Sequence, residues 1–128
     1  MKVVDVHAAT DITGFGMLGH AYQMARASQV TFRVDSEKLL LLPQVFELLS
    51  QGIKPKGHRT NRDYVGDAVE FAESVGAPVR SLMFDPQTSG GMLMSVAKER
   101  LELLLDELRR RGVEARACGE VVAQEDRL

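Results

Sequence analysis

Residues 9–20 of the chain read ATDITGFGMLGH, a glycine-rich stretch that leads directly into a predicted helix. Leu18, Ala21, Tyr22 and Ala25 follow at the spacing of one helical face. Threonines and glycines before a helix start leave backbone N–H groups free, and the helix dipole favours an anion at that end. The stretch therefore predicts a glycine-rich turn, a helix and an anion site where the two meet.

Asp11 lies in this turn, and its role has two interpretations. A carboxylate would repel a phosphate group unless a divalent cation lay between them, and Mg²⁺ typically binds one or two carboxylates together with phosphate oxygens. Alternatively, Asp11 or Thr13 caps the helix, while Gly14 and Gly16 allow close helix packing. The stretch does not match a P-loop, because no lysine follows the second glycine.

A second stretch, DPQTSGG at residues 85–91, is predicted to join two strands. Pro86 restricts Asp85 to extended geometry, and Gly90 and Gly91 permit positive φ or the close approach of another backbone. One interpretation makes this stretch a second wall of an anion or nucleotide site. The other makes it a hairpin loop in which Asp85 bonds its own turn.

The remainder of the chain predicts a mixture of helices and strands. Further helical spacing occurs at residues 43–49, at 65–72 with Asn61 as cap and Gly76 as stop, and at 101–108. Strands are predicted at residues 30–34, 79–84, 92–96 and 113–117, the last leading on to Val121 and Val122. Residues 92–96 are apolar enough for a central strand covered on both faces, and residues 51–62 read as a loop. This order indicates an α+β layered domain.

Composition limits the possible classes of function. The chain has 128 residues, the size of one domain, and a net charge of −2, which argues against a protein that mainly binds nucleic acid or an anionic membrane. One cysteine, Cys118, excludes an intrachain disulfide or a cysteine-rich zinc site. No apolar stretch is long enough to span a bilayer, and the start has no signal-peptide pattern. We therefore expect a cytoplasmic protein.

Several residues have simpler interpretations. The histidines, among them His20, are not at metal-ligand spacing. His20 is expected to be a surface or hydrogen-bonded helical residue, and Cys118 a small core residue. The run Arg109-Arg110-Arg111 is expected to be a solvated helix end.

The run from His7 to His20 closely resembles the start of the C-terminal domain of the selenophosphate synthetase (selenide, water dikinase) family. Residues 85–93 and 119–121 resemble two further signatures, and Gly57 and Asn61 lie where this family has a glycine-rich turn ending in asparagine. The resemblance covers about residues 1–122. It departs from the family at Lys56 and His58, where glycine and threonine are usual.

The resemblance implies a three-layer α/β/α fold with a mixed sheet, partly ferredoxin-like. It implies an enzyme that converts ATP, selenide and water to selenophosphate, AMP and phosphate. It also places Asp11 at the position of a carboxylate that helps to bind Mg²⁺ with the ATP phosphates. Thr10, Thr13 and Gly14 are neighbouring phosphate-site candidates on physical grounds, and no residue is assigned a catalytic role.

The glycine-rich segment, reactive cysteine or selenocysteine, partner lysine and further metal-binding aspartates of that family belong to its N-terminal domain. We therefore expect residues 1–128 to be a C-terminal domain, inactive as a dikinase when isolated and with weak Mg²⁺–nucleotide affinity at most. The full-length enzyme is expected to be a homodimer. The alternatives are a domain of another ATP-using member of the same superfamily, which includes aminoimidazole ribonucleotide synthetase, and a non-catalytic binding or dimerisation module.

Overall fold

The computed structural model describes residues 4–53 and 56–125. Its α-helices are α1 (Gly16–Ser28), α2 (Val45–Ser50), α3 (Gly57–Val65), α4 (Ala77–Leu82) and α5 (Leu101–Arg110). Its strands are β1 (Val6–Asp11), β2 (Val30–Val34), β3 (Met92–Val96) and β4 (Gly119–Ala123). Short 3₁₀ turns occur at Ser36–Lys38, Gly66–Ala68 and Lys98–Arg100.

Strands β1 and β3 form one antiparallel ribbon, in which Asp11 lies opposite Met92. Strand β1 was not predicted from the sequence, because its segment VHAATD carries small and polar residues in place of β-branched ones. Burial alternates along it, with the side chains at positions 7, 9 and 11 on the more exposed face. This alternation turns the Asp11 side chain away from the interior.

Strands β2 and β4 form a second antiparallel ribbon, with Phe32 opposite Val121 and Val34 opposite Gly119. The strand predicted at residues 113–117 is wrong, since the segment is irregular and the strand begins at Gly119. A Cβ atom at Gly119 would collide with the backbone of Arg33, so the partner strand approaches closely there.

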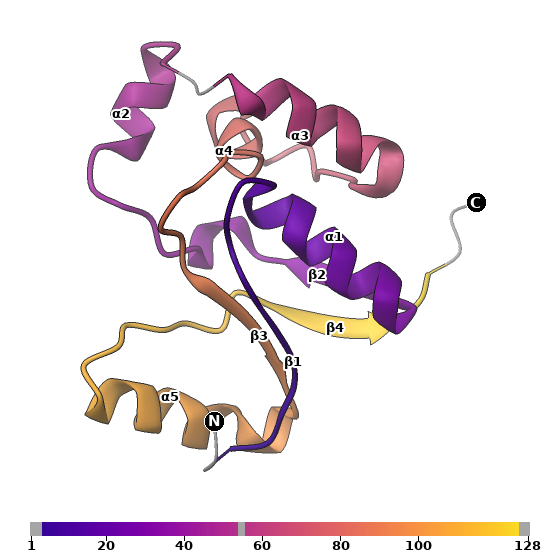
Figure 1. Cartoon of the computed structure of the whole chain (residues 1–128), viewed down its shortest axis with the longest axis vertical. Helices are drawn as coiled ribbons and strands as arrows, with labels where there is room; N and C mark the ends of the chain where they lie inside the picture. The colour runs from indigo at the N-terminus through magenta and orange to yellow at the C-terminus, as the bar shows by residue number, and fades with distance from the viewer. Residues whose placement is uncertain (1–3, 54–55, 126–128) are drawn as a thin grey trace.

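Helix α1 is the central element of the core. Its residues Met17 and Leu18 are buried with Val65, Met83 and Phe84 from the α3 and α4 regions. Figure 1 shows α3 and α4 beside the start of α1, where β1 ends, and α5 at the other end of the β1–β3 ribbon. The end of β1 is therefore surrounded by helices at one end of the molecule.

Residues 79–84 form most of α4 and its C-terminal turn, so the strand predicted there is wrong. Pro78 lies in the first turn of this helix, where a missing backbone N–H costs nothing. The residues Ser81, Leu82, Met83 and Phe84 are all buried. A short, fully buried apolar run does not distinguish a helix from a strand by its periodicity.

The helix in residues 51–72 lies earlier in the chain than the sequence predicts. The helix begins at Gly57, inside the predicted loop, and ends at Val65, where the following Gly66 has a φ of 53°. Residues 69–72 are irregular. Residues 54–55 of the predicted loop lie outside the described part of the chain. Asn61 is therefore inside the helix and is not its cap.

The α+β class is confirmed. The strands of the described residues form two separate antiparallel pairs, where the resemblance implied one mixed sheet. Met92 is 56% exposed, so β3 is not covered on both faces. Among the described residues, no helix has the length and apolar character required to cross a membrane.

Candidate functional site

The two sequence motifs meet in space. The Ile12 N–H donates to the Gly91 carbonyl at 2.8 Å, and the Gln87 N–H donates to the Thr13 carbonyl at 3.1 Å. The segment after β1 and the segment before β3 thus form adjacent walls at the start of α1. The loop 85–91 joins α4 to β3, so the hairpin interpretation of this loop is wrong.

Two glycines permit this contact. A Cβ at Gly90 would collide with the Ile12 carbonyl oxygen, which confirms the predicted close approach of another backbone. Gly16 has a φ of 70°, and a Cβ there would lie 2.9 Å from the Phe84 carbonyl carbon. Gly14, in contrast, has no atom within 4 Å of its Cβ position and is exposed. Gly14 therefore lies at the open side of the turn.

His20 is buried in α1 and reaches back to the turn. Its Nε2 lies 3.1 Å from both the backbone nitrogen and the hydroxyl oxygen of Thr13. The Thr13 N–H donates to this imidazole nitrogen, so the prediction of a hydrogen-bonded helical histidine is confirmed. The expectation of free N–H groups fails at Thr13 for the same reason.

The open N–H groups of the turn belong to Gly14 and Phe15. The N–H of Gly16 donates to the Thr13 carbonyl at 3.0 Å, and the N–H groups of Ile12 and Thr13 are engaged as described above. Within the described residues, the N–H groups of Gly14 and Phe15 donate no hydrogen bond to a backbone or side-chain acceptor. Both residues are exposed. Two adjacent donors therefore remain available to an anion.

Asn61 bridges the two motifs. Its side chain is only 4% exposed, and its Nδ2 donates to the Gly14 carbonyl at 2.8 Å and to the Phe84 carbonyl at 3.0 Å. The sequence pattern predicts Asn61 at a helix start and does not predict the bridge. The available signal was an asparagine, a poor helix former, within a helical segment.

Asp11 ends β1 at the edge of this turn. Its side chain is exposed, and within the described residues no hydrogen bond or ion pair engages its carboxylate. The cap of α1 is Phe15, with no side-chain hydrogen bond, so neither Asp11 nor Thr13 caps the helix. The capping interpretation is wrong. The hydroxyl of Thr10 donates to the Asp11 backbone oxygen at 3.1 Å.

Asp85 begins the second motif in a half-buried position. Burial raises the pKa of its carboxyl group above the ordinary value, and the nearby His58 partly opposes this shift. His58 is held by Ser81, whose Oγ lies 2.8 Å from Nε2, and by an edge-on contact with Phe84. No hydrogen bond from the described residues reaches the Asp85 carboxylate, so it does not bond its own turn.

The oxygen atoms available as metal ligands at this site suit a hard cation that binds few protein ligands. Within the described residues, no group of three or more His, Cys, Asp or Glu side chains could hold a metal ion. Asp11 offers an exposed, unengaged carboxylate beside the turn, and carboxylate oxygen is a ligand that Mg²⁺ prefers. Mg²⁺ would keep several positions for water or phosphate oxygens. The residues present therefore fit one edge of such a site.

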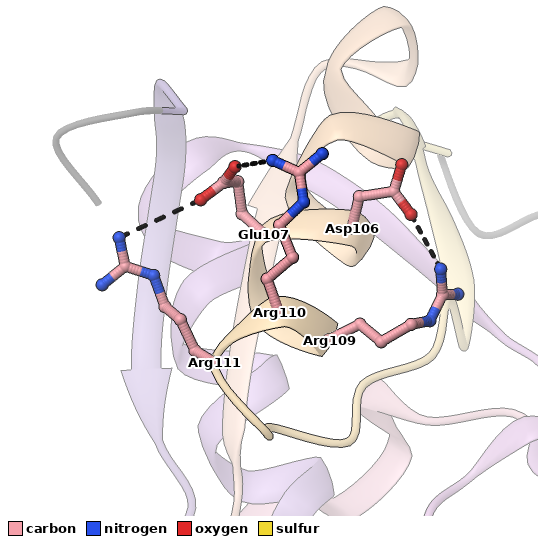
Figure 2. A network of polar contacts seen from close by, with 5 residues as sticks. All are labelled: Asp106, Glu107, Arg109, Arg110 and Arg111. Atoms are coloured by element: carbon pink, nitrogen blue, oxygen red, sulfur yellow. Dashed lines mark hydrogen bonds and ion pairs between the residues drawn. The ribbon is translucent and has the colours of Figure 1, made fainter.

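The arginine run lies far from these loops, at the end of α5 (Figure 1). Arg109 forms an ion pair with Asp106 at 2.8 Å, and Arg110 and Arg111 approach Glu107 at 2.9 and 4.0 Å. Figure 2 shows these contacts along the end of the helix. All three guanidinium groups are exposed, which confirms the prediction of a solvated helix end. These arginines are not part of the candidate site.

The model of one protein family, "AIR synthase related protein, C-terminal domain", matches residues 1–127. The chain belongs to this family. Curated relatives named "Selenide, water dikinase" are similar to it. The relative from Clostridioides difficile (strain 630) is 40% identical over 119 residues, which are 92% of this chain and 34% of the relative. The relative from Treponema denticola is 44% identical over 114 residues, which cover 89% of this chain and 32% of the relative.

A third relative of the same name, from Pseudomonas straminea, is 45% identical over 98 residues, covering 77% of this chain and 28% of the relative. The chain therefore spans about a third of the length of the curated relatives it matches. These similarities confirm the resemblance found in the sequence. The site formed by the two motif loops thus lies within a family domain that occurs in selenide, water dikinases.

Proposed function

We propose that residues 1–128 are the C-terminal domain of a selenide, water dikinase. The complete enzyme would convert ATP, selenide and water to selenophosphate, AMP and phosphate. Support comes from the family match over residues 1–127 and from relatives that carry this name at 40–45% identity. These names favour the selenium enzyme over another ATP-using member of the superfamily.

Within this domain, we assign Asp11 as the Mg²⁺-binding carboxylate. The observation that carries the assignment is its exposed, unengaged carboxylate at the edge of a turn with two open N–H donors. Asp11 would hold the cation, and the N–H of Gly14 would bind a phosphate oxygen. Thr10 and Thr13 are weaker candidates, because local hydrogen bonds already engage the Thr10 hydroxyl and the Thr13 N–H.

When bound, Mg²⁺ neutralises the charge that develops on the transferring phosphoryl group. The contribution of this chain would be to hold the cation and the phosphate oxygen in fixed positions. The backbone hydrogen bonds between residues 12–13 and 87–91 fix the turn, so its donors need little reorganisation when a phosphate binds. An oriented donor stabilises developing charge more effectively than mobile water does.

One carboxylate and two amides cannot complete the coordination of a triphosphate and its cations. We therefore expect the remaining ligands to come from the N-terminal domain of the same protein, which we propose to be a cytoplasmic homodimer when complete. The isolated chain is expected to have no dikinase activity and weak Mg²⁺–nucleotide affinity at most. Robust selenophosphate formation by this chain alone would refute the proposed division of the site.

A chimera tests the proposal. This chain would replace the matching 119-residue segment of the Clostridioides difficile relative, and phosphorus NMR would follow ATP- and selenide-dependent selenophosphate formation. The chimera should be active, and the same chimera with Asp11→Asn should lose at least tenfold in rate. A folded chimera without activity would favour the non-catalytic module instead.

A further inference from the structure

The turn that carries the two open donors is held by two different means. The Thr13 carbonyl accepts from the backbone N–H groups of Gly16 and Gln87, so main-chain hydrogen bonds fix the Thr13–Gly14 peptide. The Gly14 carbonyl instead accepts from the side chain of Asn61 at 2.8 Å. Within the described residues, that contact is the one hydrogen bond made by the Gly14–Phe15 peptide.

A planar trans peptide links the direction of its carbonyl to the direction of its N–H. The two groups lie in one plane and point in opposite directions, and no cis peptide bond occurs in the described residues. The Gly14 carbonyl points to Asn61, which is buried in α3. The N–H of Phe15 must therefore point away from the interior, on the exposed side where Gly14 also lies.

The second hydrogen of the same amide fixes the relation between the two motifs. Asn61 Nδ2 donates to the Phe84 carbonyl at 3.0 Å, directly before Asp85. A buried amide with both donors satisfied is costly to displace, because either carbonyl would be left unpaired. One side chain thus ties the glycine turn to the start of the 85–91 loop.

We propose that Asn61 is a positioning residue of the anion site: it directs the Phe15 N–H toward the ligand and holds the glycine turn against the second motif. This inference deepens the proposed function and rests on it. The N–H of Gly14 depends on main-chain hydrogen bonds, whereas the N–H of Phe15 depends on Asn61. Loss of Asn61 should therefore affect these two donors unequally.

The test compares the wild-type chain, Asn61→Ala and the matched control Thr60→Ala, whose side chain is exposed on the same helix. Residual dipolar couplings report the direction of each N–H without any ligand. In Asn61→Ala the Phe15 coupling should change while that of Gly14 stays, and Thr60→Ala should change neither. An unchanged Phe15 coupling in a folded Asn61→Ala chain would overturn the inference.

A titration with inorganic tripolyphosphate and Mg²⁺, followed through amide chemical shifts, tests whether an anion binds at the two N–H groups. Gly14 and Phe15 should both respond in the wild type; in Asn61→Ala the Phe15 response should be lost and affinity should fall about tenfold. Equal loss at both amides would indicate a merely structural role and overturn the inference. If the wild type shows no response but the Phe15 dipolar coupling still changes in Asn61→Ala, the proposed function would be contradicted. The finding that Asn61 orients the Phe15 N–H would then remain supported.

Asn61→Ser keeps one hydrogen-bond donor on a shorter side chain. If Asn61→Ala does not fold, the couplings and the titration are repeated with Asn61→Ser. Its short hydroxyl cannot reach both carbonyls, so the Phe15 coupling should again change selectively. Wild-type couplings and affinity in Asn61→Ser would overturn the inference.

Discussion

At residue 90 the fold leaves no space for a side chain. A Cβ there would collide with the Ile12 carbonyl oxygen, whereas a Cβ at Gly14 would meet nothing within 4 Å. Gly90→Ala should therefore lower the free energy of unfolding by about 1–3 kcal/mol, because the two motif loops must separate. Gly14→Ala should change it by less than about 0.5 kcal/mol. Urea denaturation measures both, and equal values would contradict the contact.

Asp85 predicts a specific dependence of stability on pH. Burial raises the pKa of its carboxyl above the ordinary value of 3.8, so the native state binds this proton more tightly than the unfolded chain does. The charged carboxylate therefore lowers the free energy of unfolding as the pH rises above 3.8 through the folded-state pKa. At neutral pH the Asp85 carboxyl is charged, so the native state no longer gains stability from binding this proton.

Asp85→Asn should accordingly be more stable than the wild type at pH 7, and this advantage should disappear by about pH 3. Because the carboxyl is partly exposed, solvent screening keeps the difference small. Thermal unfolding between pH 3 and 7 measures it, with Asp67→Asn as a control at an exposed carboxyl. A variant that is less stable than the wild type at pH 7 would show that the carboxylate has a stabilising partner.

Site residues differed in how far the sequence could predict them. The hydrogen-bonded state of His20 and the close backbone approach at Gly90 follow from local pattern, and both are confirmed. The role of Asn61 does not follow from local pattern, since its acceptors lie 47 and 23 residues away in the chain. Such a contact depends on how the helices pack, which periodicity does not encode.

Helix α5 shows how an amphipathic element is anchored. Leu104 is 8% exposed, whereas its neighbour Leu103 is 38% exposed. Leu104→Ala should lower the free energy of unfolding by about 2–4 kcal/mol, through lost burial and the cavity left behind. Leu103→Ala should cost less than about 1 kcal/mol, because alanine is a good helix former and the site is partly wet. Guanidinium chloride denaturation compares them, and similar costs would contradict the orientation of α5.

Periodicity predicted some elements correctly, but the helical spacing at residues 65–72 and the alternation at residues 113–117 did not lead to the predicted elements. The helical spacing in α1 and α5 appears in the structure as predicted, and strand β2 lies where it was predicted. Burial does not alternate strictly along β2, because Thr31 is half-buried like Val30 and Phe32. Strand β1 was missed because only pairing with β3 makes its small residues a strand. Helix α4 was mistaken for a strand because the four consecutive residues 81–84 are all buried, which removes the amphipathic pattern there.

Across the whole molecule, the candidate site depends on segments that are distant in sequence. The end of β1, the start of α1, the middle of α3 and the loop before β3 meet at one end of the β1–β3 ribbon (Figure 1). The end of β1 with the start of α1, and the loop before β3, are recognisable as motifs in the sequence. The position of α3 between them is not, because long-range packing determines it.

At the proposed site, the Asp11 carboxylate binds a cation that is shared with a phosphate group. Because no described residue engages it, Asp11→Asn should leave the free energy of unfolding within about 0.5 kcal/mol of the wild type. Asp5→Asn, at an exposed carboxyl before the same strand, removes an equal charge and serves as the control.

The most direct measurement is an amide-shift titration of this chain with Mg²⁺ and a non-hydrolysable ATP analogue. Mg²⁺-dependent shifts are expected at residues 11–15 in the wild type and in Asp5→Asn, and they should be lost in a folded Asp11→Asn chain. Shifts of the same size in Asp11→Asn would show that this carboxylate does not bind the cation.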